Sequence, residues 1–290
     1  MNFFSLFTVA VFAAETILSP LADDWFNATP TPSVPSISFG QLTVAAAPQP
    51  QVLGASTDVP APTPVPPRTK KSSYTIALLG DSMIDTLGPD APHLKTKLTR
   101  AYPGVSFQLF NYGVGGTNID YGLERITRGY QYLGRDIPSL VSKQPDIVVV
   151  ESFGYNPYPF NNGAIEKHWL ALAAIVDKLK TNLPDVNIII AATIAPDAKT
   201  FGDGAAGLSF SSDDKWKRVD GIKKYLDSTV KFAQSQRLPL ADAFHPSLGP
   251  DGNGKDVYIN QGDHIHYSDA GRNLFADVVT SAITANKLLE

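Results

Sequence analysis

From residue 72 onwards, short apolar runs alternate with longer amphipathic stretches, and this alternation limits the possible folds more than any other feature. Strands that alternate with helices pair in parallel through right-handed crossovers, so the pattern predicts a mostly parallel five-stranded sheet covered on both faces. The predicted strands are residues 74–79, 105–110, 147–151, 187–192 and 238–241. The predicted helices are residues 92–101, 119–142 with a break, 164–183, 213–236 and 268–288.

The first 71 residues have a different character. Residues 3–14 form an apolar run that suits the core of a signal peptide and is shorter than the roughly 20 residues needed to span a bilayer. Ten of the 23 prolines lie within residues 28–71, a density that favours an extended polyproline II spacer. We therefore predict an export segment at residues 1–27, a Pro/Thr/Ala-rich linker at 28–71 and one domain at 72–290, in a secreted or cell-surface protein.

Composition removes several classes of function. The chain has no cysteine, which excludes disulfides, a thiolate nucleophile, cysteine-ligated zinc and iron-sulfur clusters. Its 24 Lys+Arg and 28 Asp+Glu give a net charge of -4, without the basic excess that binding along a phosphate backbone requires. We therefore do not expect nucleic acid as a partner.

Four short polar or glycine-rich blocks lie where the predicted strands end or where the last predicted helix begins. They are Gly-Asp-Ser-Met at 80–83, Asn-Tyr-Gly-Val-Gly-Gly-Thr at 111–117, Gly-Tyr-Asn at 154–156 and Asp-His-Ile-His at 263–266. Ligands of open parallel sheets bind beyond the carboxyl ends of the strands. We therefore expect these blocks to meet at one edge of the sheet.

The residue types in these blocks suit nucleophilic catalysis. A serine hydroxyl is a weak nucleophile until a base removes its proton, and a neutral histidine is well matched to that task near pH 7. Ser82 and His266 are the candidates for these two roles. Asp263, three residues before the histidine, is placed to accept a hydrogen bond from the other ring nitrogen and to fix the tautomer.

Taken in this order, the four blocks resemble those of the SGNH (GDSL-type) hydrolase family over roughly residues 74–288. The resemblance implies a flavodoxin-like three-layer α/β/α fold and ester hydrolysis through an acyl-serine. It also implies an oxyanion hole made of the backbone N–H groups of Ser82 and Gly116 and the side-chain amide of Asn156. A glycine is sensible there, because a side chain would obstruct the approach of the backbone to the substrate.

Two positions depart from the family pattern. Met83 replaces the leucine of Gly-Asp-Ser-Leu, and Pro157 replaces the aspartate that commonly follows the asparagine of the third block. Two other interpretations fit less well. Ile84 occupies the place of the last glycine in the G-x-S-x-G motif of larger α/β-hydrolases, and residues 111–117 do not satisfy the phosphate-binding G-x-G-x-x-G spacing.

A metal site is the rival interpretation of the last block. His264 and His266 are two residues apart, and Asp263 or His245 offers a third ligand. The residues that follow, Tyr-Ser-Asp-Ala-Gly and then a predicted helix, match the hydrolase block instead. We therefore expect neither a metal nor an organic cofactor.

Three aromatic and three amide side chains crowd residues 155–162. Such a loop can stack on sugar rings, line an acyl-chain pocket or simply pack, and Tyr155, Tyr158 and Asp81 are the candidate substrate contacts. With the spacer, this loop favours a carbohydrate or cell-wall O-acetyl esterase. We expect the protein to be a monomer. A lipase or lysophospholipase, an acyltransferase with the same residues, and a catalytically idle glycan-binding domain remain alternatives.

Overall fold

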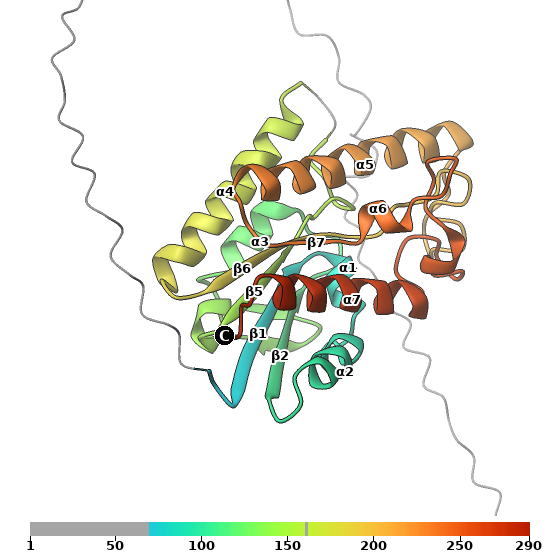
Figure 1. Ribbon diagram of the computed structural model, residues 1–290. Helices are drawn as coiled ribbons and strands as arrows, with labels where there is room; N and C mark the ends of the chain where they lie inside the picture. The colour runs from blue at the N-terminus through green and yellow to red at the C-terminus, as the bar shows by residue number, and fades with distance from the viewer. Residues whose placement is uncertain (1–69, 160–161) are drawn as a thin grey trace, which may run out of the picture.

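In the computed structural model, which describes residues 70–159 and 162–290, a five-stranded sheet forms the centre of the domain (Figure 1). Its strands lie in the order β2-β1-β5-β6-β7, and every neighbouring pair is parallel. The predicted α/β architecture is therefore confirmed, whereas the export segment and the linker up to residue 69 lie outside the described residues. The strands are β1 (Ser73–Gly80), β2 (Ser106–Gly113), β5 (Ile147–Glu151), β6 (Asn187–Ala192) and β7 (Leu240–Asp242).

Helices cover both faces of the sheet and complete the three layers (Figure 1). Alternate residues of β1 enter the two cores, Ile76 and Leu78 on one face and Ala77 and Leu79 on the other. The first face packs against α2 (Pro92–Ala101) and α7 (Asp269–Ala285), and the second against α3 (Ile119–Arg125), α4 (Ala164–Asn182) and α5 (Ser212–Ser235). Shorter elements are α1 (Ser82–Asp85), η2 (Leu140–Lys143), α6 (Phe244–Ser247) and η3 (Asp256–Tyr258).

The strand register brings the predicted blocks to one edge. Gly80 at the end of β1 pairs with Gly113 of β2, and Leu79 pairs with Val150 near the end of β5. All residues of β5 are buried, as expected for a central parallel strand with an uninterrupted apolar run. The segments that follow these strands therefore start side by side.

The helix predicted over residues 119–142 is wrong beyond Arg125. After α3 the chain forms an antiparallel hairpin of β3 (Tyr130–Tyr132) and β4 (Arg135–Ile137). The two-residue turn between them, Leu133 and Gly134, has positive φ angles of 48° and 72°, the geometry that matches the twist of a hairpin. Pro138 then prevents a return to a continuous helix.

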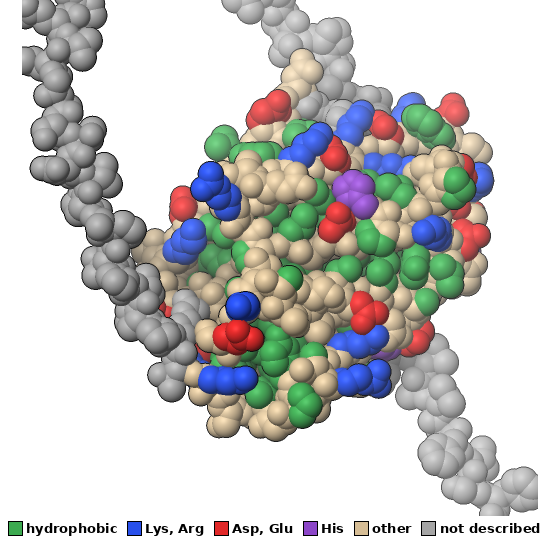
Figure 2. Space-filling model, viewed as in Figure 1, with side chains coloured by type: hydrophobic (Ala, Val, Ile, Leu, Met, Phe, Trp, Pro, Cys, Tyr) green, Lys and Arg blue, Asp and Glu red, His purple; other side chains and the backbone are tan. Residues whose placement is uncertain are grey.

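Charged or apolar patches on a surface, and membrane-spanning helices, indicate what a protein can bind. On the face seen in Figure 2, acidic and basic side chains are interspersed and neither sign forms a continuous patch. Large exposed apolar side chains are single residues on separate elements, which is ordinary for a soluble surface. Within the described part of the chain, no helix has both the length and the apolar character needed to cross a bilayer.

The turn after β5 depends on a glycine in a neighbouring helix. Phe153 has a positive φ of 52°, is fully buried, and its carbonyl accepts a hydrogen bond from the backbone N–H of Asn156 at 3.2 Å. A Cβ on Gly122 of α3 would lie only 2.3 Å from Cζ of the Phe153 ring. The close approach of α3 therefore helps to set the position of Asn156.

Gly122→Ala should destabilise the domain, although alanine is the better helix former by about 1 kcal/mol. The added methyl must displace a buried ring, and such overpacking costs typically about 1 to 3 kcal/mol. Urea unfolding measures the difference. The double variant Gly122→Ala/Phe153→Leu should recover part of the loss, and an alanine variant as stable as the parent would contradict this packing account.

Candidate active site

The nucleophile candidate sits at a sharp turn from β1 into α1. Ser82 is the first residue of α1, and Asp81 caps this helix by accepting a hydrogen bond from the backbone N–H of Met83 at 2.8 Å. A Cβ on Gly80 would lie 2.9 Å from Oε2 of Glu151, so glycine is needed where β1 ends. The turn presents a half-buried Ser82 at the edge of the sheet.

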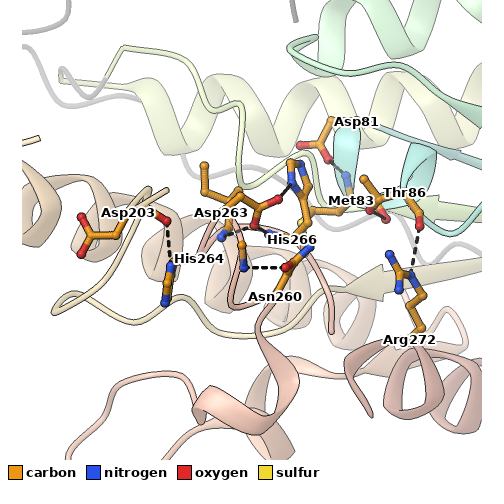
Figure 3. Close-up of polar contacts among 11 residues, drawn as sticks. Asp81, Met83, Thr86, Asp203, Asn260, Asp263, His264, His266 and Arg272 are labelled. Atoms are coloured by element: carbon orange, nitrogen blue, oxygen red, sulfur yellow. Dashed lines mark hydrogen bonds and ion pairs between the residues drawn. The ribbon is translucent and has the colours of Figure 1, made fainter. Parts of the chain in front are cut away.

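The predicted base and its orienting carboxylate are joined within one loop before α7. Nδ1 of His266 lies 2.8 Å from Oδ2 of Asp263, and Oδ1 of Asp263 accepts the backbone N–H groups of Ile265 and His266 at 2.9 and 3.0 Å (Figure 3). Burial opposes ionisation of Asp263, but these hydrogen bonds and the charge of His266 outweigh it and lower the pKa of Asp263. A neutral ring that donates from Nδ1 has its lone pair on Nε2.

His266 faces the nucleophile turn. Figure 3 shows its ring beside Asp81 and Met83, and the charge of His266 acts on Asp81 and on Asp85, which flank Ser82 in the sequence. Nε2 of His266 is buried and has no hydrogen-bond partner among the described residues. Catalytic hydrogen bonds of free enzymes often tighten only when substrate is bound. The unpaired Nε2 is therefore the ring atom that is free to accept a hydrogen bond from Ser82 when substrate is bound.

The three oxyanion candidates also meet around this turn. A Cβ on Gly115 would lie 3.9 Å from Cβ of Ser82, so the loop that contains Gly116 passes directly beside the serine. Gly116 is exposed, with a positive φ of 69° and open space on its side-chain position. Asn156 reaches the same turn, because its Nδ2 donates to Oδ2 of Asp81 at 3.0 Å. One amide hydrogen of Asn156 is thus fixed, and the other is not used by this bond.

The side chain of Asp81, a predicted substrate contact, is taken up by hydrogen bonds within the protein. Its side chain is fully buried, and its two oxygens accept from Met83 and Asn156. Glu151 is also fully buried, and its carboxyl accepts from the backbone N–H of Asp81 at 3.2 Å and from Oγ of Ser152 at 2.5 Å. These contacts place two carboxyl groups together underneath the serine.

Ionising both Asp81 and Glu151 is unfavourable, because both are buried and their negative charges repel. Burial and the negative charge of Asp81 raise the pKa of Glu151 well above its usual value. Burial also raises the pKa of Asp81, while the hydrogen bonds from Met83 and Asn156 and the charge of His266 oppose that rise. The hydrogen bonds to Asp81 therefore favour its ionised form relative to that of Glu151, whose pKa is the more strongly raised.

Two tyrosines of the aromatic loop, both candidate substrate contacts, make contacts within the domain, as in the packing alternative that the sequence left open. The Tyr155 hydroxyl donates to the carbonyl of Ile194 at 3.0 Å, and its ring packs against Phe201 with centroids 6.3 Å apart. Tyr158 is buried, donates its hydroxyl to Asp120, and carries the Lys167 ammonium over its ring. Residues 160 and 161 of this loop lie outside the described residues.

One buried charge beneath the site gave no signal in the sequence. Arg125 of α3 is almost fully buried, and its Nη2 donates to the carbonyl of Gly80 at 2.9 Å, just before the nucleophile turn. Its guanidinium also lies 5.1 and 5.7 Å from the ring centroids of Tyr121 and Tyr130. Arg125 therefore braces the end of β1 and supplies positive charge near Asp81.

A second Asp-x-x-His pair reproduces the geometry of the first. Nδ1 of His245 lies 2.7 Å from Oδ2 of Asp242, and the His245 backbone N–H donates to Oδ1 at 3.1 Å. The His245 side chain is 51 % exposed, against 21 % for His266. The charge of His266, and not that of His245, is among the main influences on Asp81 and Asp85. The Asp-x-x-His spacing of residues 242–245 could have revealed this second pair from the sequence. The spacing could not have shown which histidine lies near Ser82.

The metal-site alternative finds no support in the side-chain positions. Nδ1 of His264 is paired with the carbonyl of Asp203 at 2.7 Å, while His266 is paired with Asp263 (Figure 3). Across residues 70–159 and 162–290, no group of three or more His, Asp or Glu side chains is arranged to hold a metal ion. His264 instead joins the histidine loop to the segment after β6.

Comparison with known proteins assigns the chain to a family. The GDSL-like Lipase/Acylhydrolase family matches residues 78–274, most of the described domain. The chain therefore belongs to this family, and it is a serine ester hydrolase. Among curated proteins, none matches the chain.

Solved structures share the fold at low sequence identity. A lipase/acylhydrolase from Enterococcus faecalis is 17% identical, with a TM-score of 0.53 over 73% of this chain and 96% of that one. A GDSL-like lipase from Bacteroides thetaiotaomicron is 13% identical, with a TM-score of 0.52 over 73% and 89%. The acetyl xylan esterase AlAXEase is 18% identical, with a TM-score of 0.50 over 72% and 99%. These likenesses confirm the GDSL/SGNH hydrolase fold.

The acid pair predicts a pH-dependent effect of Glu151→Gln on stability. As pH rises above about 4.5, the unfolded chain releases the Glu151 proton while the folded protein keeps it, so this group makes folding less favourable with rising pH. Glutamine has no proton to lose. The stability of the variant relative to the parent should therefore rise as the pH increases above about 4.5, by at most about 1.4 kcal/mol per pH unit.

Thermal unfolding of both proteins across this pH range measures the difference. The comparison cancels the titration of all other groups that the substitution leaves unaffected. A difference in Tm that stays constant with pH would show that Glu151 titrates normally in the folded protein.

Proposed function

We propose that the protein hydrolyses esters through an acyl-serine formed on Ser82. The observation that carries the proposal is the fixed His266 ring, whose Nδ1 is held by Asp263 and whose buried Nε2 has no partner within the described residues. A base in this state can take a proton from a neighbouring hydroxyl. The His266 ring lies beside Asp81, the residue before Ser82, so that serine is its natural partner (Figure 3).

In the first half-reaction, Oγ of Ser82 bonds to the ester carbonyl carbon and its proton passes to Nε2 of His266. The negative carbonyl oxygen is held by the backbone N–H groups of Ser82 and Gly116 and by the Asn156 amide, each donor worth about 3 to 4 kcal/mol of barrier. The bond to the alcohol oxygen then breaks, and His266 gives that oxygen the proton. Asp263 keeps the ring oriented and stabilises its charged form.

In the second half-reaction, water replaces the alcohol. His266 removes a proton from the water, the water oxygen bonds to the acyl carbon, and the same three donors hold the new oxyanion. The bond to Oγ of Ser82 breaks, His266 returns the proton to the serine, and the free acid leaves. A sugar hydroxyl in place of water would give acyl transfer with the same residues.

We further propose a carbohydrate or cell-wall O-acetyl ester as the substrate. One solved structure with this fold is an acetyl xylan esterase, and the surroundings of Ser82 are polar on the Gly115 side. The inward packing of Tyr155 and Tyr158 removes the aromatic loop as an argument for sugar stacking. Fast turnover of long-chain acyl esters in preference to acetyl esters would favour the lipase alternative.

Ser82→Ala and His266→Ala should each lower the hydrolysis of p-nitrophenyl acetate by at least about a thousandfold, because the members of such a triad act as a unit. His245→Ala is the matched control, since it removes a more exposed histidine with the same Asp-x-x-His geometry. It should retain the activity of the parent. A series of p-nitrophenyl esters of increasing acyl length gives the acyl preference in the same assay.

Equal activity in all four proteins would contradict the catalytic assignment. Loss of activity in His245→Ala but not in His266→Ala would assign the base to the other pair. Binding of an acetylated glycan by a parent protein that turns over no ester would favour the idle glycan-binding domain.

We also propose that residues 1–27 direct export and that residues 28–71 tether the enzyme at the cell surface. The support is the apolar run at residues 3–14 and the proline-rich composition that follows it. Sequencing the N-terminus of the protein isolated from its natural cells should find a chain that begins after the apolar run. An intact Met1 on protein found inside the cell would contradict export.

A further inference from the structure

A polar pair next to the nucleophile is used by no step of the proposed reaction. Asp85 ends the same helical turn that Ser82 begins, so the two residues are three apart on α1 and lie on the same side of it. Two features of β2 hold this turn in place. Nδ2 of Asn111 donates to the carbonyls of Ile84 and Gly88 at 2.8 and 2.7 Å. A Cβ on Gly113 would lie 2.1 Å from the Asp85 backbone nitrogen, so only glycine permits this approach.

The partner of Asp85 comes from the hairpin that the sequence did not predict. The hydroxyl of Tyr132 donates to Oδ2 of Asp85 at 2.7 Å and accepts the backbone N–H of Gly115 at 3.1 Å. A Cβ on Gly115 would lie 3.4 Å from the Tyr132 hydroxyl and 3.9 Å from both Oδ2 of Asp85 and Cβ of Ser82. The carboxyl, the phenol and the serine therefore surround one small gap that a glycine leaves open.

The carboxyl has capacity to bind something else. Oδ1 of Asp85 makes no hydrogen bond to another described residue, and both Asp85 and Tyr132 are only half-buried. Burial raises the pKa of Asp85, whereas the Tyr132 bond and the charges of His266 and Arg125 oppose that rise. In either protonation state the carboxyl can form a hydrogen bond with a hydroxyl group.

We infer that Asp85 and Tyr132 form a specificity subsite that binds a free hydroxyl on the alcohol half of the ester, next to the acylated position. The inference rests on the proposed function and narrows its substrate to neutral polyhydroxylated alcohols such as sugars. An acetyl group has no donor that this pair can use, whereas a sugar hydroxyl has one. A carboxylate at this place disfavours anionic alcohols, such as uronates or phosphate-bearing lipids, through like-charge repulsion.

The competing explanation is that the pair only braces the oxyanion loop through Gly115. The two explanations differ in which substrates are affected. A brace acts on every ester, because every ester forms the same oxyanion. A subsite acts only on esters whose alcohol carries a free hydroxyl.

The test uses three esters: a monoacetylated methyl xyloside with free hydroxyls, its fully acetylated counterpart, and p-nitrophenyl acetate. Asp85→Ala should lower kcat/KM on the monoacetylated xyloside by roughly tenfold to a hundredfold more than on the other two. Tyr132→Phe, which keeps the ring and its packing, should shift the same ratio in the same direction. Asp85→Asn keeps one acceptor oxygen and should lose less selectivity than Asp85→Ala.

Asp90→Ala is the matched control, because it removes an exposed acid whose carboxylate pairs with Lys95 instead. It should leave the ratio at its parental value, and the Tm of each variant verifies folding. An equal fall on all three esters in Asp85→Ala and Tyr132→Phe would overturn the subsite and leave only the brace. Absence of Ser82-dependent turnover of any ester by the parent would instead overturn the proposed function, and the subsite with it.

Discussion

The buried carboxylate of Asp81 fixes the position of the Ser82 turn relative to Asn156. It holds the start of α1 through the backbone N–H of Met83 and orients the amide of Asn156, so the serine turn and one oxyanion donor share a single anchor. A fully buried charge is costly unless its hydrogen bonds are satisfied and a countercharge is near. The hydrogen bonds from Asn156 and Met83 and the positive charge of Arg125 meet that requirement. The raised pKa of Glu151 disfavours a second negative charge beside Asp81.

Much of the fold and the main constellation could be predicted from the sequence. Buried parallel strands give uninterrupted apolar runs, so β5 and β6 were predicted at their observed bounds. The polar blocks were informative because parallel strands end at one edge, which brings Ser82 and the loop of Gly115 together. The Asp263–His266 contact followed from their spacing within one loop.

The remainder depends on contacts between distant segments. The strands of the hairpin at residues 130–137 are only three residues long, and its turn needs a positive φ at Leu133, a residue type that rarely adopts it. Arg125 gives no pattern that marks it as buried beneath Gly80. Tyr158 lies in a predicted loop, yet its ring is buried, and its hydroxyl and ring face are covered by the surface side chains of Asp120 and Lys167. Burial of such polar side chains is decided by their tertiary partners, which local sequence does not encode.

If Ser82 carries the acyl group, it should react with a covalent serine label. The full chain is treated with a serine-reactive fluorophosphonate, digested, and mapped by mass spectrometry. We expect one phosphonylated peptide with the label on Ser82, much slower labelling of His266→Ala, and unchanged labelling of His245→Ala. A label on another serine, or equal labelling rates in the parent and His266→Ala, would contradict it.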